Sequence, residues 1–396
     1  MLKLRSELLR ETSDKTIVCS LIFDKMAIRK YIEWDGQRYH GFVDMGATID
    51  FASNIEAKEV LVFMLVAIND TWKVPVGYFM INSLNSEQKA SLVTQCLALI
   101  KECNVVVTNV TFDGCPANFR MASALGCNLS IHNLDPCFGV EKTNILPNPS
   151  HMCKLIRNTF GEKRKLIDAE NGIIDFSYVE QLNELQESEG LHLANNLRRR
   201  HIQFFKQKMK VKLATQLLSR SVAEALLFCR DQLRIRNFEN CGPTAKFILI
   251  MNDAFDILNS KNLRDFGLKQ AVCHRNIQDI QDFSLKFEEY VKKLKFTSNS
   301  LVIESNRKTG FLGFSIGLRA ILNIYKEYIY GNSGRKLLQF LPVYKCSQDH
   351  LELYFSDVRS QLGRNDNPTC RQFKSCYKKL LVHNEVSNKG IGKCHL

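Results

Sequence analysis

Two apolar, β-rich runs in the first third of the chain each stop at an aspartate, and this pattern constrains the fold most. Residues 16–23 read TIVCSLIF and precede Asp24, whereas residues 105–112 read VVVTNVTF and precede Asp113. Short runs of this composition, bounded by polar residues, are typical of buried strands. In α/β sheets, functional groups collect where the carboxyl ends of neighbouring strands leave a crevice. The sequence therefore predicts an α/β sheet in which Asp24 and Asp113 converge.

The segments around these two runs alternate between strand and helix patterns. Two strand-like runs flank Asp35-Gly36, which is a hairpin signal, and residues 86–102 have helical periodicity with a serine start signal. The stretch DGCPAN at 113–118 opens a further short helix. A buried strand is predicted at 60–68 and a further strand at 74–81. A run of strands followed by helix, strand and helix supports the α/β class.

The middle of the chain, from about residue 150 to 300, is predicted to be mainly helical, and a further helix is predicted at 310–329. Within the middle segment, residues 197–212 contain seven Lys or Arg and no acid, with Phe204 and Phe205 between them. This segment either faces phosphates or forms a solvated basic helix face.

Composition allows a large core and favours an anionic partner. The chain has 396 residues, of which 45% are hydrophobic and 24% charged, and this suits one large domain or two to three smaller ones. Its formal net charge is +13. An excess of this size favours nucleic acid as the first candidate partner, although a basic surface without a specific role has the same composition.

The cysteines and the apolar runs indicate a soluble, intracellular protein. There are 14 cysteines but no CxxC pair, so we expect mostly buried thiols in a reducing compartment and no structural zinc site. The amino-terminal residues 1–15 are too charged for a signal peptide. The longest apolar run, 60–68, is too short to span a bilayer, so we expect no membrane partner.

An apolar helical stripe near the carboxyl end carries two acids. The stripe repeats at helical spacing and consists of Leu351, Tyr354, Phe355, Val358 and Leu362. Asp349 and Glu352 lie three residues apart on a neighbouring face. Acids in such a position either belong to a solvated helix edge or meet a cation, a metal or a ligand.

Together these features resemble the P element transposase family, which includes the THAP domain-containing transposases of animals. The resemblance spans about residues 16–382. Its motifs are DGxxxN at 113–118, HxxKxxRN at 151–158, FDxxNS at 255–260, and QDxLExxFSxxR from 348 with GxNDNPT ending at 369. It implies an RNase H-like α/β catalytic domain split by a mainly α-helical insertion that binds GTP. The domains are then expected at 1–147, 148–298 and 299–396.

The resemblance also implies a DDE-type acidic triad of Asp24, Asp113 and Glu352, which would be both catalytic residues and metal ligands. Carboxylates suit Mg²⁺ or Mn²⁺ because these hard ions prefer oxygen. Two such ions would activate water to cut a DNA strand, and the freed 3′-hydroxyl would then attack target DNA. Without metal, the three acids are expected to repel one another and raise their pKa values.

A GTP site is implied by the same resemblance. The implied nucleotide contacts are Lys210, Val211, Ser219, Phe255, Asp256, Asn259 and Asp349. Asp256 suits guanine, because a carboxylate accepts both N1–H and the exocyclic amine. No GxxxxGK[ST] loop is present, so we expect GTP to support DNA assembly rather than to serve as fuel. Ordinary core packing and helix capping are the alternative for Phe255 and Asn259.

DNA, both transposon ends and target, is the implied macromolecular partner, with a nuclear location. Phosphate contacts are assigned to the basic residues of the middle segment, namely Lys154, Arg157, Arg198, Arg199, Arg200, Lys206 and Lys208. A homo-oligomer is expected because transposition holds two DNA ends together.

The sequence departs from the family pattern at several positions. Lys25 stands where Glu is common, Asn148 where Asp is frequent, and Asn195 and Asn196 where Lys is usual. No zinc domain or coiled coil is visible at the start. A non-catalytic nucleic-acid-binding relic, or a domesticated transposase that keeps the fold and GTP, is therefore the alternative. A plain RNase H-like nuclease would leave the FDxxNS segment unexplained.

Overall fold

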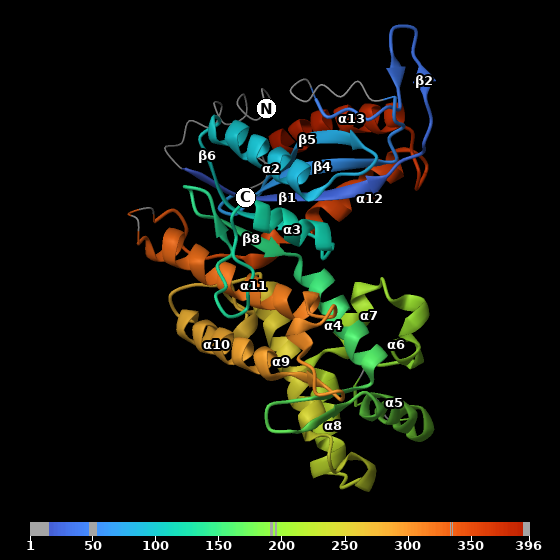
Figure 1. Cartoon of the computed structure of the whole chain (residues 1–396), viewed down its shortest axis with the longest axis vertical. Helices are drawn as coiled ribbons and strands as arrows, with labels where there is room; N and C mark the ends of the chain where they lie inside the picture. The colour runs from blue at the N-terminus through green and yellow to red at the C-terminus, as the bar shows by residue number, and fades with distance from the viewer. Residues whose placement is uncertain are drawn as a thin grey trace. The chain divides into compact units, whose positions relative to one another are not determined.

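The computed structural model describes residues 16–46, 54–190, 193–194, 196–332, 334 and 336–390, with side chains up to 381. Expectations for residues 1–15 and Asn195 lie outside this range. The chain divides into two compact units, which we describe separately (Figure 1). The first comprises Met1–Cys127, Phe138–Asn144 and Lys345–Leu396, and the second comprises Asn128–Cys137 and Ile145–Tyr344.

The first unit is built on a sheet whose strand order is β5-β4-β1-β6-β8-β7. The strands are β1 (Ile17–Ala27), β4 (Glu59–Ala67), β5 (Lys73–Ile81), β6 (Val105–Phe112), β7 (Cys137–Phe138) and β8 (Thr143–Pro147). β1 runs antiparallel to β4 and parallel to β6. The four longest strands confirm the predicted strand runs: most side chains of β1, β4 and β6 are buried, whereas most of those of β5 are half-buried.

One boundary was wrong: β1 does not end at Asp24 but continues to Ala27. The physical reason is its antiparallel partner β4, which pairs with β1 as far as Ala27 opposite Glu59. Pairing with the parallel neighbour β6 stops earlier, at Ile22 opposite Thr111. Asp24 therefore lies where β1 has left β6 but is still held by β4.

Helices of the first unit cover this sheet: α2 (Ser86–Lys101), α3 (Pro116–Ala124), α12 (Asp349–Gln361) and α13 (Cys370–Gly390). The start of α2 was predicted at a serine, but Asn85 caps it by accepting from the backbone N–H of Gln88 at 2.7 Å. The predicted stripe of α12 is confirmed, because Leu351, Tyr354, Phe355 and Val358 are buried in one cluster with β1, β4 and α13.

A two-stranded hairpin extends from the sheet of the first unit (Figure 1). It consists of β2 (Glu33–Trp34) and β3 (Tyr39–His40), which pair antiparallel around the predicted Asp35-Gly36 turn. This confirms the hairpin signal.

The second unit is mainly helical, as predicted. Its helices are α4 (Pro149–Lys163), α5 (Ser177–Glu189), α6 (Arg199–Ile202), α7 (Val211–Leu217), α8 (Arg220–Asp231), α9 (Gly242–Leu258), α10 (Ile277–Lys293) and α11 (Thr309–Ile324), which continues into a π-helix at Tyr325–Tyr330. Shorter 3₁₀ turns occupy Phe204–Gln207, Arg236–Phe238, Gly267–Lys269 and Val302–Glu304, and another, Val343–Cys346, follows at the end of the unit. α11 and α4 approach closely at Gly310, where a Cβ would lie 2.9 Å from the Met152 carbonyl oxygen.

Three features of the second unit were not predicted. A small sheet forms from β9 (Lys165–Ile167), β10 (Ile173–Asp175) and β11 (Lys295–Phe296) in the order β10-β9-β11. The basic segment 197–212 is not one helix, because α6, a 3₁₀ turn and the start of α7 divide it. The unit also extends to Tyr344, beyond the predicted insertion, whose boundaries stay a prediction because a compact unit need not coincide with a family domain.

The described cysteines are all free, and most are buried, as expected. Across the described residues, no helix combines the length and the apolar composition that a membrane-spanning segment needs.

Candidate active site

The two predicted aspartates follow neighbouring parallel strands in matching positions. Ile22 of β1 pairs with Thr111 of β6, and Asp24 and Asp113 each lie two residues further along. Both side chains are half-buried. The short extension of β1 therefore brings the two carboxylates to the same edge of the sheet, as the sequence predicted.

Two hydrogen bonds hold the beginning of α12 against these strand ends. The Gln348 side-chain amide donates to the Phe23 carbonyl oxygen at 3.0 Å. The Thr111 hydroxyl donates to the Cys346 carbonyl oxygen at 2.7 Å. Both bonds are buried, and their strand partners stand one or two residues before the aspartates. We call this pair of bonds the α12 clamp. Glu352 lies in the first turn of the helix that it holds.

The charges of the other two acids both act on Asp24. Burial is the largest cause that raises the pKa of Asp24, and the charges of Asp113 and Glu352 also raise it, whereas the Lys25 backbone N–H and ammonium lower it; together these effects raise the pKa from 3.8 to about 7. Like charges raise each other's pKa values only when they are close. Asp24, Asp113 and Glu352, far apart in sequence, therefore form one acidic cluster in the first unit.

Asp113 is oriented by a chain of polar contacts that the sequence only half revealed. Asn118 donates from its amide nitrogen to Asp113 Oδ1 at 2.5 Å, and the Cys115 backbone N–H donates to the same oxygen at 3.1 Å. The Asn118 oxygen accepts from the buried Lys89 ammonium at 2.7 Å. Because an ammonium only donates, Lys89 fixes which end of the amide faces Asp113. The DGxxxN motif indicated Asn118, but no local pattern indicated Lys89.

Lys25 stands beside Asp24 where the family commonly has Glu, and its side chain binds Glu59. Its ammonium contacts both carboxylate oxygens of Glu59, at 3.0 and 3.1 Å. Only its backbone N–H donates to Asp24, at 2.8 Å. The cation therefore has its own acidic partner.

The donor set of the cluster fits a hard divalent cation. Three carboxylates supply only oxygen ligands, which Mg²⁺ and Mn²⁺ prefer, and the pKa of Asp24 is raised chiefly by burial and also by the charges of the other two acids. Within the described part of the chain, however, no three His, Cys, Asp or Glu side chains are grouped closely enough to hold an ion as they stand. The residues fit in chemistry, and the cluster has to tighten around the cation.

Several predicted nucleotide residues of the second unit lie at the ends of α8 and α9. Ser219 precedes the first turn of α8, and Asp256 and Asn259 lie at the last turn of α9. Asn252 links the two ends, because its oxygen accepts from the Arg220 backbone N–H at 3.1 Å and its nitrogen donates to Asp256 at 2.8 Å. The structure thus links the backbone of Arg220, the residue after Ser219, to Asp256 through Asn252, which sequence reasoning missed.

The Asp256 carboxylate is half-buried. Burial raises the pKa of Asp256. The Lys269 ammonium, at 3.9 Å, lowers this pKa, and the charge of Asp253 raises it. Phe255 is also half-buried beside it, which leaves part of the ring accessible. Lys210 and Val211 begin α7. Asp349 belongs to the first unit, as the first residue of α12.

Two of the predicted phosphate contacts are wrong. Lys154 is 4% exposed and Arg157 is fully buried. The Arg157 guanidinium donates to the Gln207 and Lys208 carbonyl oxygens, both at 3.3 Å, and lies over the Phe204 ring. It therefore holds the basic segment in place instead of facing phosphates. The sequence could not show this, because helical spacing does not distinguish a surface cation from one that supports a loop.

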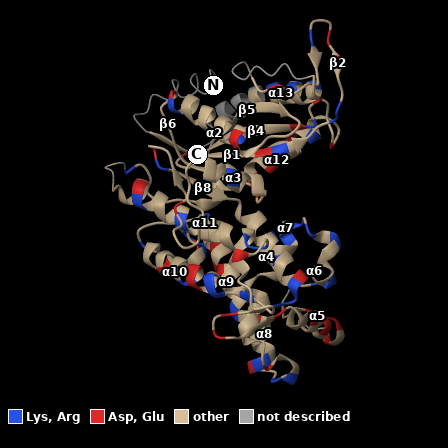
Figure 2. Cartoon of the chain, viewed as in Figure 1, with Lys and Arg blue, Asp and Glu red and all other residues tan. Residues whose placement is uncertain are grey.

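The other members of that set are at least partly accessible. Arg198, Arg199, Arg200 and Lys206 are exposed, whereas Lys208 is half-buried and contacts Glu162 at 2.5 Å. Figure 2 shows the distribution of charged residues along the chain. These five residues remain candidates for phosphate contact.

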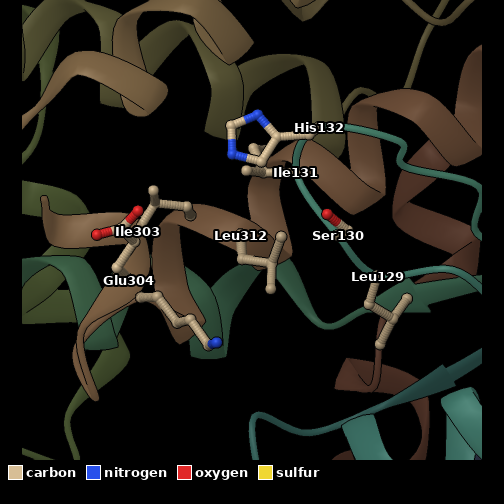
Figure 3. A pocket seen from close by; sticks show the side chains of 8 residues that line it. Leu129, Ser130, Ile131, His132, Ile303, Glu304 and Leu312 are labelled. Carbon is tan, nitrogen blue, oxygen red and sulfur yellow. The ribbon is translucent and has the colours of Figure 1, made fainter.

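A pocket of about 370 Å³ lies in the second unit, away from the predicted nucleotide residues (Figure 3). It is lined by Leu129, Ser130, Ile131, His132, Ile303, Glu304, Lys308 and Leu312. None of the sequence-predicted site residues is among them.

Comparison with known proteins agrees with this architecture. Residues 1–126 match the TNP-like RNase H N-terminal domain, residues 150–271 the TNP-like GTP-binding insertion domain, and residues 344–378 the TNP-like RNase H C-terminal domain. The chain is 30% identical to the human DNA transposase THAP9 over 375 residues and 24% identical to the Drosophila melanogaster transposable element P transposase over 380 residues. These alignments cover 91% and 93% of the chain but only 40% and 46% of the relatives.

A solved structure shares the fold. The Drosophila P element transposase strand transfer complex matches with a TM-score of 0.74 and 22% identity, covering 92% of this chain and 76% of that one. Fold and domain matches thus define a transposase-type chain in which an RNase H-like domain is split by a GTP-binding insertion domain. By these matches, the chain is homologous to both the THAP9 and the P element transposase. The chain spans less than half the length of the curated relatives it matches.

Proposed function

We propose that this chain is the catalytic part of a DDE-type DNA transposase, with Asp24, Asp113 and Glu352 as metal ligands. The observation that carries the proposal is the α12 clamp, which ties the beginning of the glutamate's helix to the two strand ends that bear the aspartates. A structural role alone would not require three mutually repelling carboxylates, since like charges at one site cost stability.

Each acid has a distinct task in this scheme. Asp113, oriented by Asn118 and Lys89, presents a fixed carboxylate oxygen. Asp24 would give up its proton on binding a cation, because positive charge would offset the burial and the neighbouring acids that raise its pKa. Glu352 closes the cluster from α12. Divalent cations, once bound, would supply an activated attacking oxygen and stabilise the leaving oxygen of the phosphodiester.

We infer that GTP binds the insertion and supports assembly. The proposed contacts are Lys210, Val211, Ser219, Phe255, Asp256 and Asn259. The match of residues 150–271 to a GTP-binding insertion domain supports this, as does the half-buried Asp256, a suitable acceptor for the two guanine N–H groups. The contact predicted for Asp349 is tested by measuring whether Asp349→Asn lowers GTP affinity.

DNA is the proposed partner, in the nucleus and with a homo-oligomer formed on it. The excess of 54 Lys and Arg over 41 Asp and Glu supports an anionic partner. Phosphate contacts are proposed for Arg198, Arg199, Arg200, Lys206 and Lys208. A tagged chain that stays outside the nucleus would contradict the proposed location.

The test is calorimetric titration of Mn²⁺ into the wild type, Asp113→Asn and Glu352→Gln, with circular dichroism to confirm folding. Asp357→Asn is the matched control, because Asp357 is an exposed acid on the same helix. We expect both site variants to lose binding and the control to keep it. Equal binding by all four proteins would exclude the triad.

A non-catalytic relic is the second candidate. It is favoured by the fact that, among the described residues, no three acids are yet close enough to hold an ion. Strand cleavage of supercoiled DNA with Mn²⁺ separates the two: the relic leaves the plasmid intact, whereas the transposase nicks it and Glu352→Gln does not.

A further inference from the structure

The β2–β3 hairpin of the first unit is a built element and not a loose loop. The Asp35 carboxylate accepts from the backbone N–H groups of Gln37 and Arg38, both at 2.9 Å, and contacts His40 at 2.5 Å. Gly36 supplies the positive φ of +97° that the turn needs. At the base, Gly41 lies so close to Tyr31 that a Cβ would sit 2.1 Å from the Tyr31 carbonyl oxygen.

This hairpin displays aromatic rings to solvent. Trp34 and Tyr39 are cross-strand partners, so their side chains share one face, with ring centroids 4.8 Å apart. They remain 54% and 64% exposed, and Tyr31 beside them is 52% exposed. Exposed aromatic rings gathered in this way mark a contact surface, because burying them against a partner gains free energy.

The acids of the hairpin both have partners within the protein. Glu33 pairs with Arg371 at 2.8 Å, and Asp35 contacts His40, which carries a positive charge only when it is protonated. Arg29 and Lys30, which precede β2, and Arg38 in the turn are exposed, and their side chains make no ion pair with another described residue. The hairpin and the segment that leads into it therefore offer aromatic rings and exposed cations without an ion-pair partner.

We propose that this hairpin binds unpaired bases of DNA, with Trp34 and Tyr39 as the stacking surface and Arg29, Lys30 and Arg38 as phosphate contacts. The inference rests on the DNA partner proposed above and assigns it a further contact surface. Aromatic rings stack on bases of any sequence once these are out of the duplex, and cations follow the backbone. An apolar protein partner would leave the three cations unexplained.

The first experiment uses Trp34 as its own reporter. The chain has two tryptophans, so Trp72→Phe leaves Trp34 as the only one. We expect a single-stranded oligothymidylate of about 20 nucleotides to quench its fluorescence, and a fully paired duplex of the same length to quench it less. In this background, Tyr39→Leu should weaken binding of the single strand at least about fivefold. The control Phe266→Leu removes a ring that is 92% exposed in the second unit.

The second experiment measures the salt dependence of binding. Changing Arg29, Lys30 and Arg38 to Gln should reduce the slope of log affinity against log salt by about 2, from three phosphate contacts on a single strand. The matched control changes Arg234, Arg236 and Lys286 to Gln, which removes the same charge from exposed sites of the second unit. Thermal melts verify that all variants fold.

The outcomes separate this inference from the proposed function. If the protein binds the oligonucleotide but Trp34 is not quenched, or if both charge triples alter the slope equally, the hairpin inference is wrong and the DNA partner stands. If the Trp72→Phe protein binds neither single-stranded nor duplex DNA, the DNA partner itself is lost. Quenching with a slope change confined to the hairpin triple supports the inference.

Discussion

Asp24 carries the electrostatic cost of the acidic cluster. Its pKa rises from 3.8 to about 7, chiefly through burial and then through Asp113 and Glu352. Between these pH values the folded protein retains a proton that the unfolded chain has released. The free energy of unfolding contributed by this group therefore falls as the pH rises through this window.

Asp24→Asn should consequently stabilise the metal-free protein at pH 8, by about 1–2 kcal/mol after allowance for solvent screening, and change little near pH 4. Urea unfolding at both pH values measures this. Added Mn²⁺ should reverse the ranking at pH 8, since only the wild type retains all three carboxylates. A stabilisation that is the same at both pH values would show that Asp24 does not titrate in this window.

A second prediction for a single residue concerns Asp256. An asparagine there still accepts from N1–H but offers an amide donor where guanine also has a donor. Asp256→Asn should therefore lower GTP affinity at least about tenfold and favour XTP, whose 2-oxo group accepts that donor. Calorimetry with both nucleotides measures this. Asp282→Asn, an exposed acid on α10, should bind both as the wild type does.

Residue types showed part of the site in advance. Asp113 was predictable because β6 ends immediately before it. Glu352 was noticed as an acid beside an apolar stripe, but its role was predicted only from the family resemblance. Lys89 was not, since a lysine on an amphipathic helix normally faces water. Its burial comes from a tertiary contact with Asn118, and no local pattern encodes such a contact.

Helices and strands are aligned by specific polar contacts, which cannot be predicted from the hydrophobic pattern of the sequence. The apolar stripe predicted that α12 packs on the sheet, and it does. The α12 clamp, however, depends on one hydroxyl and one amide, and neither changes the hydrophobic period. The same limit explains the undetected strands β9 and β10, which have three residues each and are too short to show alternation.

Removing one bond of the clamp should loosen Glu352 more than it destabilises the fold. Thr111→Val keeps the shape of the side chain but leaves the Cys346 carbonyl oxygen without this donor, at a cost of about 1–3 kcal/mol. We expect Mn²⁺ affinity to fall severalfold by calorimetry. Thr108→Val, which removes a buried hydroxyl from the same strand, is the control. An equal loss of affinity in both variants would refute a specific role of the clamp.

The contact of α11 with α4 gives a graded prediction. A Cβ at Gly310 would meet the Met152 carbonyl oxygen at 2.9 Å, which cannot move without shifting α4, whereas one at Gly317 would meet the flexible Leu258 side chain at 2.8 Å. Gly310→Ala should therefore lower the free energy of unfolding by about 1–3 kcal/mol, and Gly317→Ala by less. Chemical denaturation followed by circular dichroism gives the comparison, and the reverse order would contradict it.

The whole molecule consists of two compact units, for which different ligands are proposed. Both tryptophans, Trp34 and Trp72, belong to the first unit, so tryptophan fluorescence follows that unit during heating. Far-ultraviolet circular dichroism is dominated by the helical second unit. The two signals thus report different parts of one chain.

A ligand stabilises the unit that binds it. Mn²⁺ at a hundred times its Kd should add about 2.7 kcal/mol to the first unit and raise the fluorescence transition, with a smaller effect on the dichroism transition. The Glu352→Gln variant should show no shift in fluorescence. A rise confined to the dichroism transition would place the metal site in the second unit and contradict the assignment.

The α12 clamp also has a consequence for the order of synthesis. One of its bonds joins residues 325 positions apart in the chain. A ribosome adds roughly 5–20 residues per second, so Phe23 waits for tens of seconds, while the entire second unit is made, before Gln348 emerges. During that interval the nascent sheet holds Asp24 and Asp113 without Glu352. Under the proposed function, the acidic cluster is therefore complete only after the insertion has been synthesised, and a chain interrupted within the insertion would lack Glu352.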